Sequence, residues 1–120
     1  MRTTITVVTT FAAAHRLPEH EGKCCRLHGH TYGLEVTVEG TPQTSGPAAG
    51  MVIDFAELRQ RVNELIVDQV DHQLLNDVFD FVPTVEAMAA WAFGRLQDAG
   101  LPAVRVRLAE GPNTYVEVTA

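Results

Sequence analysis

The sequence has little of what disulfide-stapled or membrane-spanning proteins need. Its two cysteines, Cys24 and Cys25, are neighbours, and a bridge between neighbouring residues is strained, so we expect no structural disulfide. The sequence contains no run of about 18 apolar residues, and we therefore expect no membrane-spanning helix. The N-terminus shows no basic segment followed by an apolar stretch, which argues against a signal peptide and favours a cytoplasmic location.

Positive charge is also scarce. Nine Lys and Arg residues stand against fifteen Asp and Glu, which gives a net charge of -6, and no basic run occurs. Nucleic-acid binders usually carry a basic patch or stripe, so we expect no nucleic-acid partner. The chain has 120 residues, of which 46% are hydrophobic, and this length and composition predict a single globular domain over residues 1–120.

Apolar spacing predicts four strands and two helices. The strands are expected at residues 3–12, 28–39, 104–108 and 114–119, and the helices at residues 54–70 and from 84 to a stop at Gly100. Asp54 and Glu57 resemble a capping box at the first helix start. Residues 71–82 are expected to form a connection. The order and the short connections favour an α+β fold, an antiparallel sheet with both helices on one face.

Ionisable residues lie at the ends of three apolar stripes. The alternation that contains Phe11 continues to His15, the second stripe contains His28 and His30, and the third ends on Glu110. Residues i and i+2 of a strand share a face, so His28 and His30 can point at one ion. An isolated carboxylate is costly to bury, and we therefore expect Glu110 to meet a partner at this end of the sheet.

Three imidazoles favour a zinc site with one open position, the arrangement of catalytic zinc. Each histidine taken singly is more often a core or surface residue, and only the set favours a metal. A structural Cys/His zinc site is the competing interpretation. It is disfavoured because the sequence has no Cys-x-x-Cys pair and adjacent cysteines chelate one ion poorly.

Two further groups permit both a functional and a structural interpretation. Asp71 and His72 follow the first predicted helix and could charge a thiol such as Cys24, although such residues are more often solvated or capping. Glu86 lies two residues after Thr84, one short of a capping box. Its carboxylate either favours the positive end of the helix dipole or accepts hydrogen bonds from a guanine-like ring.

An ordered set of motifs resembles the 6-pyruvoyltetrahydropterin synthase/6-carboxytetrahydropterin synthase family over nearly the whole chain. The motifs are FAAAH at 11–15, KC at 23–24, LHGH at 27–30, VIDF at 52–55, VDH at 70–72, LND at 75–77, PTVE at 83–86, and Glu110. The resemblance implies a tunnelling fold in which subunits join their sheets into a trimeric barrel and two trimers stack as a hexamer. Active sites would then lie at subunit interfaces.

The resemblance also implies a role for each candidate residue. The zinc ligands would be His15, His28 and His30; Cys24 would be the proton-abstracting base assisted by Asp71 and His72; Thr84, Glu86 and Glu110 would contact the substrate, with Glu86 as the anchor of the pterin ring. Family spacing selects Cys24 over Cys25, since the family cysteine lies four residues before the first His of His-Gly-His. Gly111 stands where a Thr commonly follows the acid, which is a departure from the family pattern.

The implied activity is conversion of 7,8-dihydroneopterin triphosphate to 6-carboxytetrahydropterin, acetaldehyde and triphosphate, in a pathway to a 7-deazapurine such as queuosine. The compact length resembles the bacterial carboxy-forming branch. Pyruvoyl formation from the same substrate is the alternative within the family. A non-catalytic zinc-binding module and a generic zinc hydrolase are the alternatives outside it, and the hydrolase lacks a His-Glu-x-x-His motif. Arg16, Lys23 and Arg26 are interpreted as solvated charges, with a triphosphate contact as the alternative.

Overall fold

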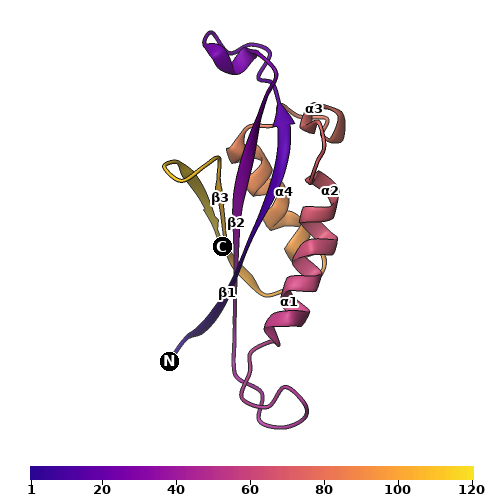
Figure 1. Cartoon of the computed structure of the whole chain (residues 1–120). Helices are drawn as coiled ribbons and strands as arrows, with labels where there is room; N and C mark the ends of the chain where they lie inside the picture. Colours follow the sequence, from indigo (N-terminus) through magenta and orange to yellow (C-terminus); the bar gives the residue numbers. More distant parts are fainter.

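A computed structural model describes all residues, 1–120, and confirms the predicted α+β architecture (Figure 1). One antiparallel sheet has the strand order β1-β2-β3-β4. The strands are β1 (Thr3–His15), β2 (His28–Gly40), β3 (Ala103–Ala109) and β4 (Tyr115–Thr119). The helical segments are η1 (Lys23–Cys25), α1 (Phe55–Val62), η2 (Asn63–Val67), α2 (Asp68–Val70), α3 (Leu75–Val78) and α4 (Val85–Asp98).

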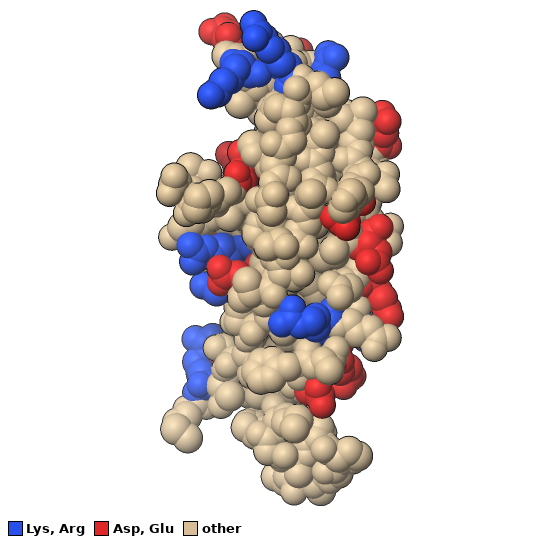
Figure 2. Space-filling view, in the orientation of Figure 1, with Lys and Arg blue, Asp and Glu red and all other residues tan.

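The molecule is elongated, with extents of 54 × 25 × 24 Å. The long strands β1 and β2 run along it, and the loop that joins them, residues 16–27, forms a tip at one end (Figure 1). Lys and Arg side chains gather over this tip, whereas Asp and Glu are more frequent along the helical side (Figure 2). None of the helices combines the length and the apolar character that crossing a membrane requires.

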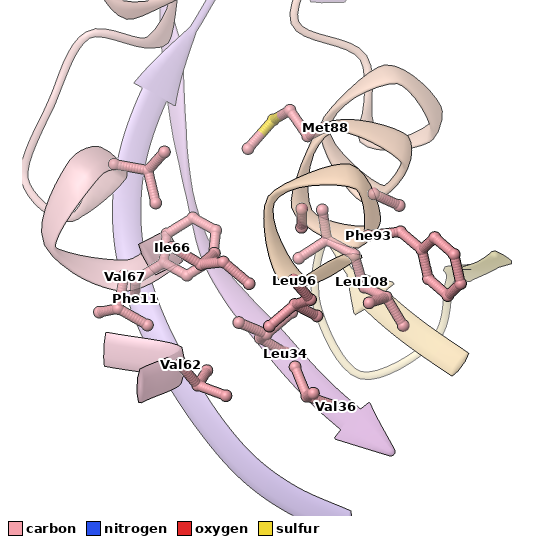
Figure 3. Close-up of a cluster of buried hydrophobic side chains, with 14 of the residues drawn as sticks. Phe11, Leu34, Val36, Val62, Ile66, Val67, Met88, Phe93, Leu96 and Leu108 are labelled. Carbon is pink, nitrogen blue, oxygen red and sulfur yellow. The ribbon is translucent and has the colours of Figure 1, made fainter. Parts of the chain in front are cut away.

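The alternating stripes predicted from the sequence face the helices. Tyr32, Leu34, Val36 and Val38 of β2 have no exposed surface. Leu34 and Val36 face Leu96 of α4, and Phe11 of β1 lies near Ile66 (Figure 3). Removing these side chains from water stabilises the packing of the helical layer on one face of the sheet. The histidines therefore sit on the same, helix-covered face as the core.

The helical layer differs from the prediction in three details. The helix expected over 54–70 is present but contains the π-helical turn η2, where the carbonyl of Leu65 accepts a hydrogen bond from Arg95 Nε at 3.0 Å. The expected connection at 71–82 contains the short helix α3. Asp54 caps the helix as predicted, but its carboxylate accepts from the N–H of Ala56 at 2.7 Å and not from that of Glu57, so the full capping box is not formed.

The segment after α2 is fastened along the end of β1. The N–H of His72 donates to the carbonyl of Ala12 at 2.6 Å, and the N–H of Ala14 donates to the carbonyl of Gln73 at 3.0 Å. Ala14 and Leu74 form an isolated parallel bridge. This pairing satisfies backbone groups on the outer edge of β1, and it holds residues 72–74 beside the strand end that carries His15.

Candidate active site

Three histidines meet at the end of the sheet nearest the tip. The register of β1 on β2 places His15 opposite His28 and Ala13 opposite His30. One ligand atom from each of the three side chains lies within 4.8 Å of the other two. His15 is 1% exposed, and the other two are half-buried. The convergence predicted from strand parity is therefore present.

Two of the rings are oriented by backbone carbonyls. His15 Nδ1 lies 2.8 Å from the carbonyl oxygen of Pro83, and His28 Nδ1 lies 2.7 Å from that of Arg26. A carbonyl can only accept, so each Nδ1 carries the proton and each Nε2 presents a lone pair. The two Nε2 atoms lie 3.0 Å apart. Two lone pairs at this distance repel unless a proton or a cation lies between them.

The third ring is kept neutral by its surroundings. His30 Nε2 is buried without a hydrogen-bond partner, and the nearest acid oxygen, Glu110 Oε2, lies 3.9 Å away. Burial lowers the pKa of His30, and the neighbouring His15 and His28 lower it further, against the opposing effect of Glu110. A neutral imidazole is the form that binds metal.

This donor set fits a divalent transition metal. Oriented Nε2 lone pairs, an orphaned buried ring nitrogen and three nitrogen donors within 4.8 Å meet the needs of zinc, which binds His at about 2.0–2.1 Å in a tetrahedron. Magnesium and calcium prefer oxygen donors and fit poorly. Orientation of a ligand histidine by a backbone carbonyl is the usual outer-shell arrangement of zinc sites.

Cys24 shares a pocket with two of the three clustered histidines. A pocket of about 430 Å³ is lined by Lys23, Cys24, Arg26, Leu27, His28 and His30. Both cysteines are free and half-buried, but Cys25 does not line this pocket. The placement therefore distinguishes the two adjacent thiols, and the role of Cys24 stays a prediction.

Asp71 and His72 contact each other but not Cys24. His72 Nδ1 lies 3.0 Å from Asp71 Oδ2, and Asp71 Oδ1 accepts a hydrogen bond from the N–H of Ala12 at 3.0 Å. That N–H, followed by His72, holds the pKa of Asp71 below its ordinary value. His72 and His30 line a second pocket, of about 560 Å³, which does not include Cys24. Within one chain, Cys24 and His72 therefore line different pockets.

Thr84 and Glu86 lie at the start of α4. The hydroxyl of Thr84 caps the helix by accepting from the N–H of Ala87 at 3.1 Å. Glu86 is exposed and makes no hydrogen bond or ion pair within the chain. The carbonyl that orients His15 belongs to Pro83, so the cap of α4 is built directly beside a metal-ligand candidate. Thr84 thus directly follows the residue whose carbonyl orients His15, whereas the side chain of Glu86 makes no contact with the cluster.

Three supporting groups could not have been found from sequence spacing. The carbonyls of Pro83 and Arg26 orient two rings, and a backbone carbonyl has no signature in a sequence. Asn76 accepts from the N–H of Arg16 and donates to its carbonyl, both at 2.9 Å, which fixes the residue next to His15. The LND motif marked Asn76 without giving it this role.

Comparisons with known proteins show which family the chain resembles. The family model described as 6-pyruvoyl tetrahydropterin synthase matches residues 4–120. A 6-carboxy-5,6,7,8-tetrahydropterin synthase from Synechocystis sp. is 46% identical over 95 residues, covering 78% of this chain and 74% of that protein. A dihydroneopterin monophosphate aldolase from Pyrococcus furiosus is 37% identical over 97 residues, covering 81% and 77%.

The solved structure of 6-pyruvoyl tetrahydropterin synthase from Caenorhabditis elegans superposes with a TM-score of 0.84 at 29% identity. It covers 100% of this chain and 96% of that chain. The strand order and the arrangement of the helices therefore belong to a fold that has been solved before.

Proposed function

The chain belongs to the 6-pyruvoyl tetrahydropterin synthase family, and from this premise we propose that it is a zinc-dependent 6-carboxytetrahydropterin synthase. The reaction takes 7,8-dihydroneopterin triphosphate and one water to 6-carboxytetrahydropterin, acetaldehyde and triphosphate. The 46% identity to the Synechocystis relative supports this reaction among those that the relatives' names describe. A place in a 7-deazapurine pathway such as queuosine formation, and a cytoplasmic location, remain part of the proposal.

One observation carries the proposal: the thiol of Cys24 lines the same pocket as His28 and His30, two members of the three-histidine cluster. A non-catalytic metal module has no need of a half-buried thiol beside its metal ligands. When bound by His15, His28 and His30, zinc would polarise the side-chain oxygens of the substrate and favour loss of the neighbouring C–H proton. The carbonyls of Pro83 and Arg26 would keep two of these ligands in the binding tautomer.

The chain's own residues would move the proton and hold the ring. Cys24, as thiolate, would take the proton from the substrate side chain, and a positioned base of this kind contributes about 100- to 10,000-fold. Asp71 and His72 would assist it, with the Asp71 carboxylate orienting the imidazole of His72. Glu86 would accept hydrogen bonds from the pterin ring beside Thr84, and Glu110 would contact the substrate near His30.

The placement of these residues in the fold favours an active site that is shared between subunits. Cys24 and His72 line different pockets of one chain, and the exposed Glu86 has no partner within it. A second copy could supply the missing half of each site. We therefore propose a homo-oligomer, a trimer or a dimer of trimers, in which residues 1–120 form one domain and neighbouring chains complete each active site.

The test is incubation of purified, zinc-loaded protein with 7,8-dihydroneopterin triphosphate and identification of the products by mass spectrometry. Carboxy product with acetaldehyde supports the proposal. Formation of the pyruvoyl product would mean that this chain catalyses the reaction named for the C. elegans relative. Retained zinc without turnover of this substrate would overturn the enzymatic assignment and favour a metal-binding module.

A further inference from the structure

The helix that leads to Asp71 and His72 is interrupted by the π turn η2. The N–H of Asp68 donates to the carbonyl of Asn63, five residues back. Ordinary helical spacing then returns, since the N–H of Asp71 donates to the carbonyl of Val67, four residues back, at 2.8 Å. Between these two bonds, two backbone N–H groups remain for three carbonyls. The backbone of the turn is therefore one donor short.

Side chains supply the missing donor. Arg95 Nε, on the neighbouring helix α4, donates to the carbonyl of Leu65 at 3.0 Å. Gln69 Nε2 donates to the carbonyl of Glu64 at 3.3 Å. Gln69 is exposed, so water can take the place of its amide, whereas Arg95 is half-buried. The bond from Arg95 is therefore the contact on which the π turn depends.

The π turn sets the rotation of the helix end that follows it. One extra residue rotates the following residues by about 100° and shifts them by about 1.5 Å relative to an uninterrupted helix. In the observed rotation, Asp71 Oδ1 accepts from the N–H of Ala12 at 3.0 Å, and the N–H of His72 donates to the carbonyl of Ala12 at 2.6 Å. Without the extra residue, the carboxylate of Asp71 would point away from this N–H.

We infer that Arg95 is a positioning residue of the active site, because its bond to Leu65 holds the π turn that directs Asp71 and His72 to β1. The inference rests on the proposed function, in which these two residues assist the base. The guanidinium of Arg95 also lies over the ring of Trp91, 5.9 Å from its centroid. Both of its contacts are structural, so Arg95 acts through the helix and not on the substrate.

The test uses two replacements that differ in the atom at the position of Nε. Arg95→Gln keeps an N–H donor there, Arg95→Met places a methyl group there, and both remove the charge. Arg59→Met is the matched control, because Arg59 also donates to a backbone carbonyl, that of Val8 at 2.8 Å, but lies on α1 before the π turn. The zinc-loaded proteins are assayed for kcat, KM and metal content with 7,8-dihydroneopterin triphosphate.

Arg95→Met should lower kcat by about 10- to 100-fold with KM and zinc content unchanged, since a misplacement of about 1 Å can cost this much. Arg95→Gln and Arg59→Met should stay within about threefold of the wild type. If Arg95→Met does not fold, Arg95→Lys takes its place, because lysine also has a carbon at the position of Nε, and its kcat should fall below that of Arg95→Gln. Equal kcat with and without the donor would overturn the inference.

A second measurement does not depend on turnover. Asp71→Ala should destabilise the wild type but have little effect in Arg95→Met, where Asp71 no longer meets the N–H of Ala12. The same replacement should keep its full effect in Arg59→Met, because distant sites are additive. Denaturant titrations of the single and double variants measure this coupling, and additive effects of Arg95→Met and Asp71→Ala would contradict the inference. Coupling in a wild type that does not convert the substrate would overturn the proposed function and uphold the positioning of Asp71 by Arg95.

Discussion

The Nε2 atoms of His15 and His28 lie 3.0 Å apart, while the Nδ1 atom of each ring faces a backbone carbonyl. The two rings come from neighbouring strands that pair these residues directly. Because the carbonyls fix both tautomers, the two Nε2 lone pairs are pointed at each other. This relationship is unfavourable in the bare protein and favourable around a cation, so the fold holds the pair ready for a metal.

His28→Ala should therefore lose stoichiometric metal, since it removes one of three donors and one of two oriented ligands. Metal content of the purified protein, measured by elemental mass spectrometry, checks this. Removal of metal from the wild type with a chelator should lower the melting temperature, because a ligand that binds only the folded state stabilises it. The exposed His20 lies outside the cluster, and His20→Ala should keep its metal. Full metal content in His28→Ala would contradict the site.

Cys24→Ala should lower kcat by about 100- to 10,000-fold while zinc remains bound, since a positioned base is lost and no metal donor is removed. Cys25→Ala is the matched control, because it removes the adjacent thiol that does not line the pocket. Its kcat should stay within about threefold of the wild type, an effect worth less than 1 kcal/mol. An inactive Cys25→Ala protein beside an active Cys24→Ala protein would reverse the assignment.

Mixing two inactive variants tests the shared site. Cys24→Ala and His72→Ala each damage one half of the proposed catalytic group, and the two halves line different pockets of one chain. After subunit exchange, mixed oligomers should recover part of the wild-type activity, because some interfaces then combine an intact Cys24 with an intact His72. A mixture of Cys24→Ala with Cys24→Ala/His72→Ala is the control and should stay inactive. If the first mixture also stays inactive despite proven exchange, each site lies within one subunit.

The carboxylate of Asp71 should make stability depend on pH in the acid range. The N–H of Ala12 holds the pKa of this group below its ordinary value of 3.8. A group whose pKa is depressed in the folded state stabilises the fold above its unfolded pKa, and this contribution is lost as the pH falls through the folded pKa. The difference in free energy of unfolding between wild type and Asp71→Ala should therefore be constant near neutral pH and shrink below about pH 4.

Denaturant titrations at several pH values measure this difference. Asp80→Ala serves as the control, because its carboxylate makes no hydrogen bond or ion pair in the structure. The two variants should diverge at neutral pH and converge in acid. A stability difference for Asp71→Ala that persists unchanged to pH 2 would mean that its charge is irrelevant to the fold.

We expect the backbone conformation of His72 to lower the stability of the fold while its side chain serves the activity. Its φ of 59° lies in the left-handed region, which costs a non-glycine residue roughly 1–2 kcal/mol, while glycine loses about 0.5–1 kcal/mol through its greater freedom when unfolded. His72→Gly should therefore match or exceed the wild type in stability by up to about 1 kcal/mol, with activity lost. His72→Val, with a branched side chain at positive φ, should be less stable than either. Thermal unfolding of the three proteins decides the order.

The strands, the two main helices and the convergence of the histidines could be predicted from the sequence. Alternation over Tyr32, Leu34 and Val36 specifies one buried face, because a shift by one residue would expose every apolar side chain. The same parity carries His28 and His30 onto that face. The motif set then identified the family, which the match over residues 4–120 confirms.

The tertiary structure decided the details that depend on long-range contacts. The π turn η2 and the short helix α3 have no local signature as clear as apolar spacing, and the bond from Arg95 to Leu65 joins residues 30 positions apart. The placement of Asp71 at the N–H of Ala12, rather than at Cys24, likewise depends on how residues 71–74 pack along β1. No local pattern encodes such a contact.

The sequence by itself determined which residue types reach the candidate site, because strand periodicity sets the face on which each side chain lies. Only the tertiary structure decided how the side chains of the site are oriented. The carbonyl of Pro83 lies 68 residues from His15 in the chain and 2.8 Å from its ring in the fold. A backbone carbonyl is the same group at every residue, so its position near a particular side chain is set by packing alone.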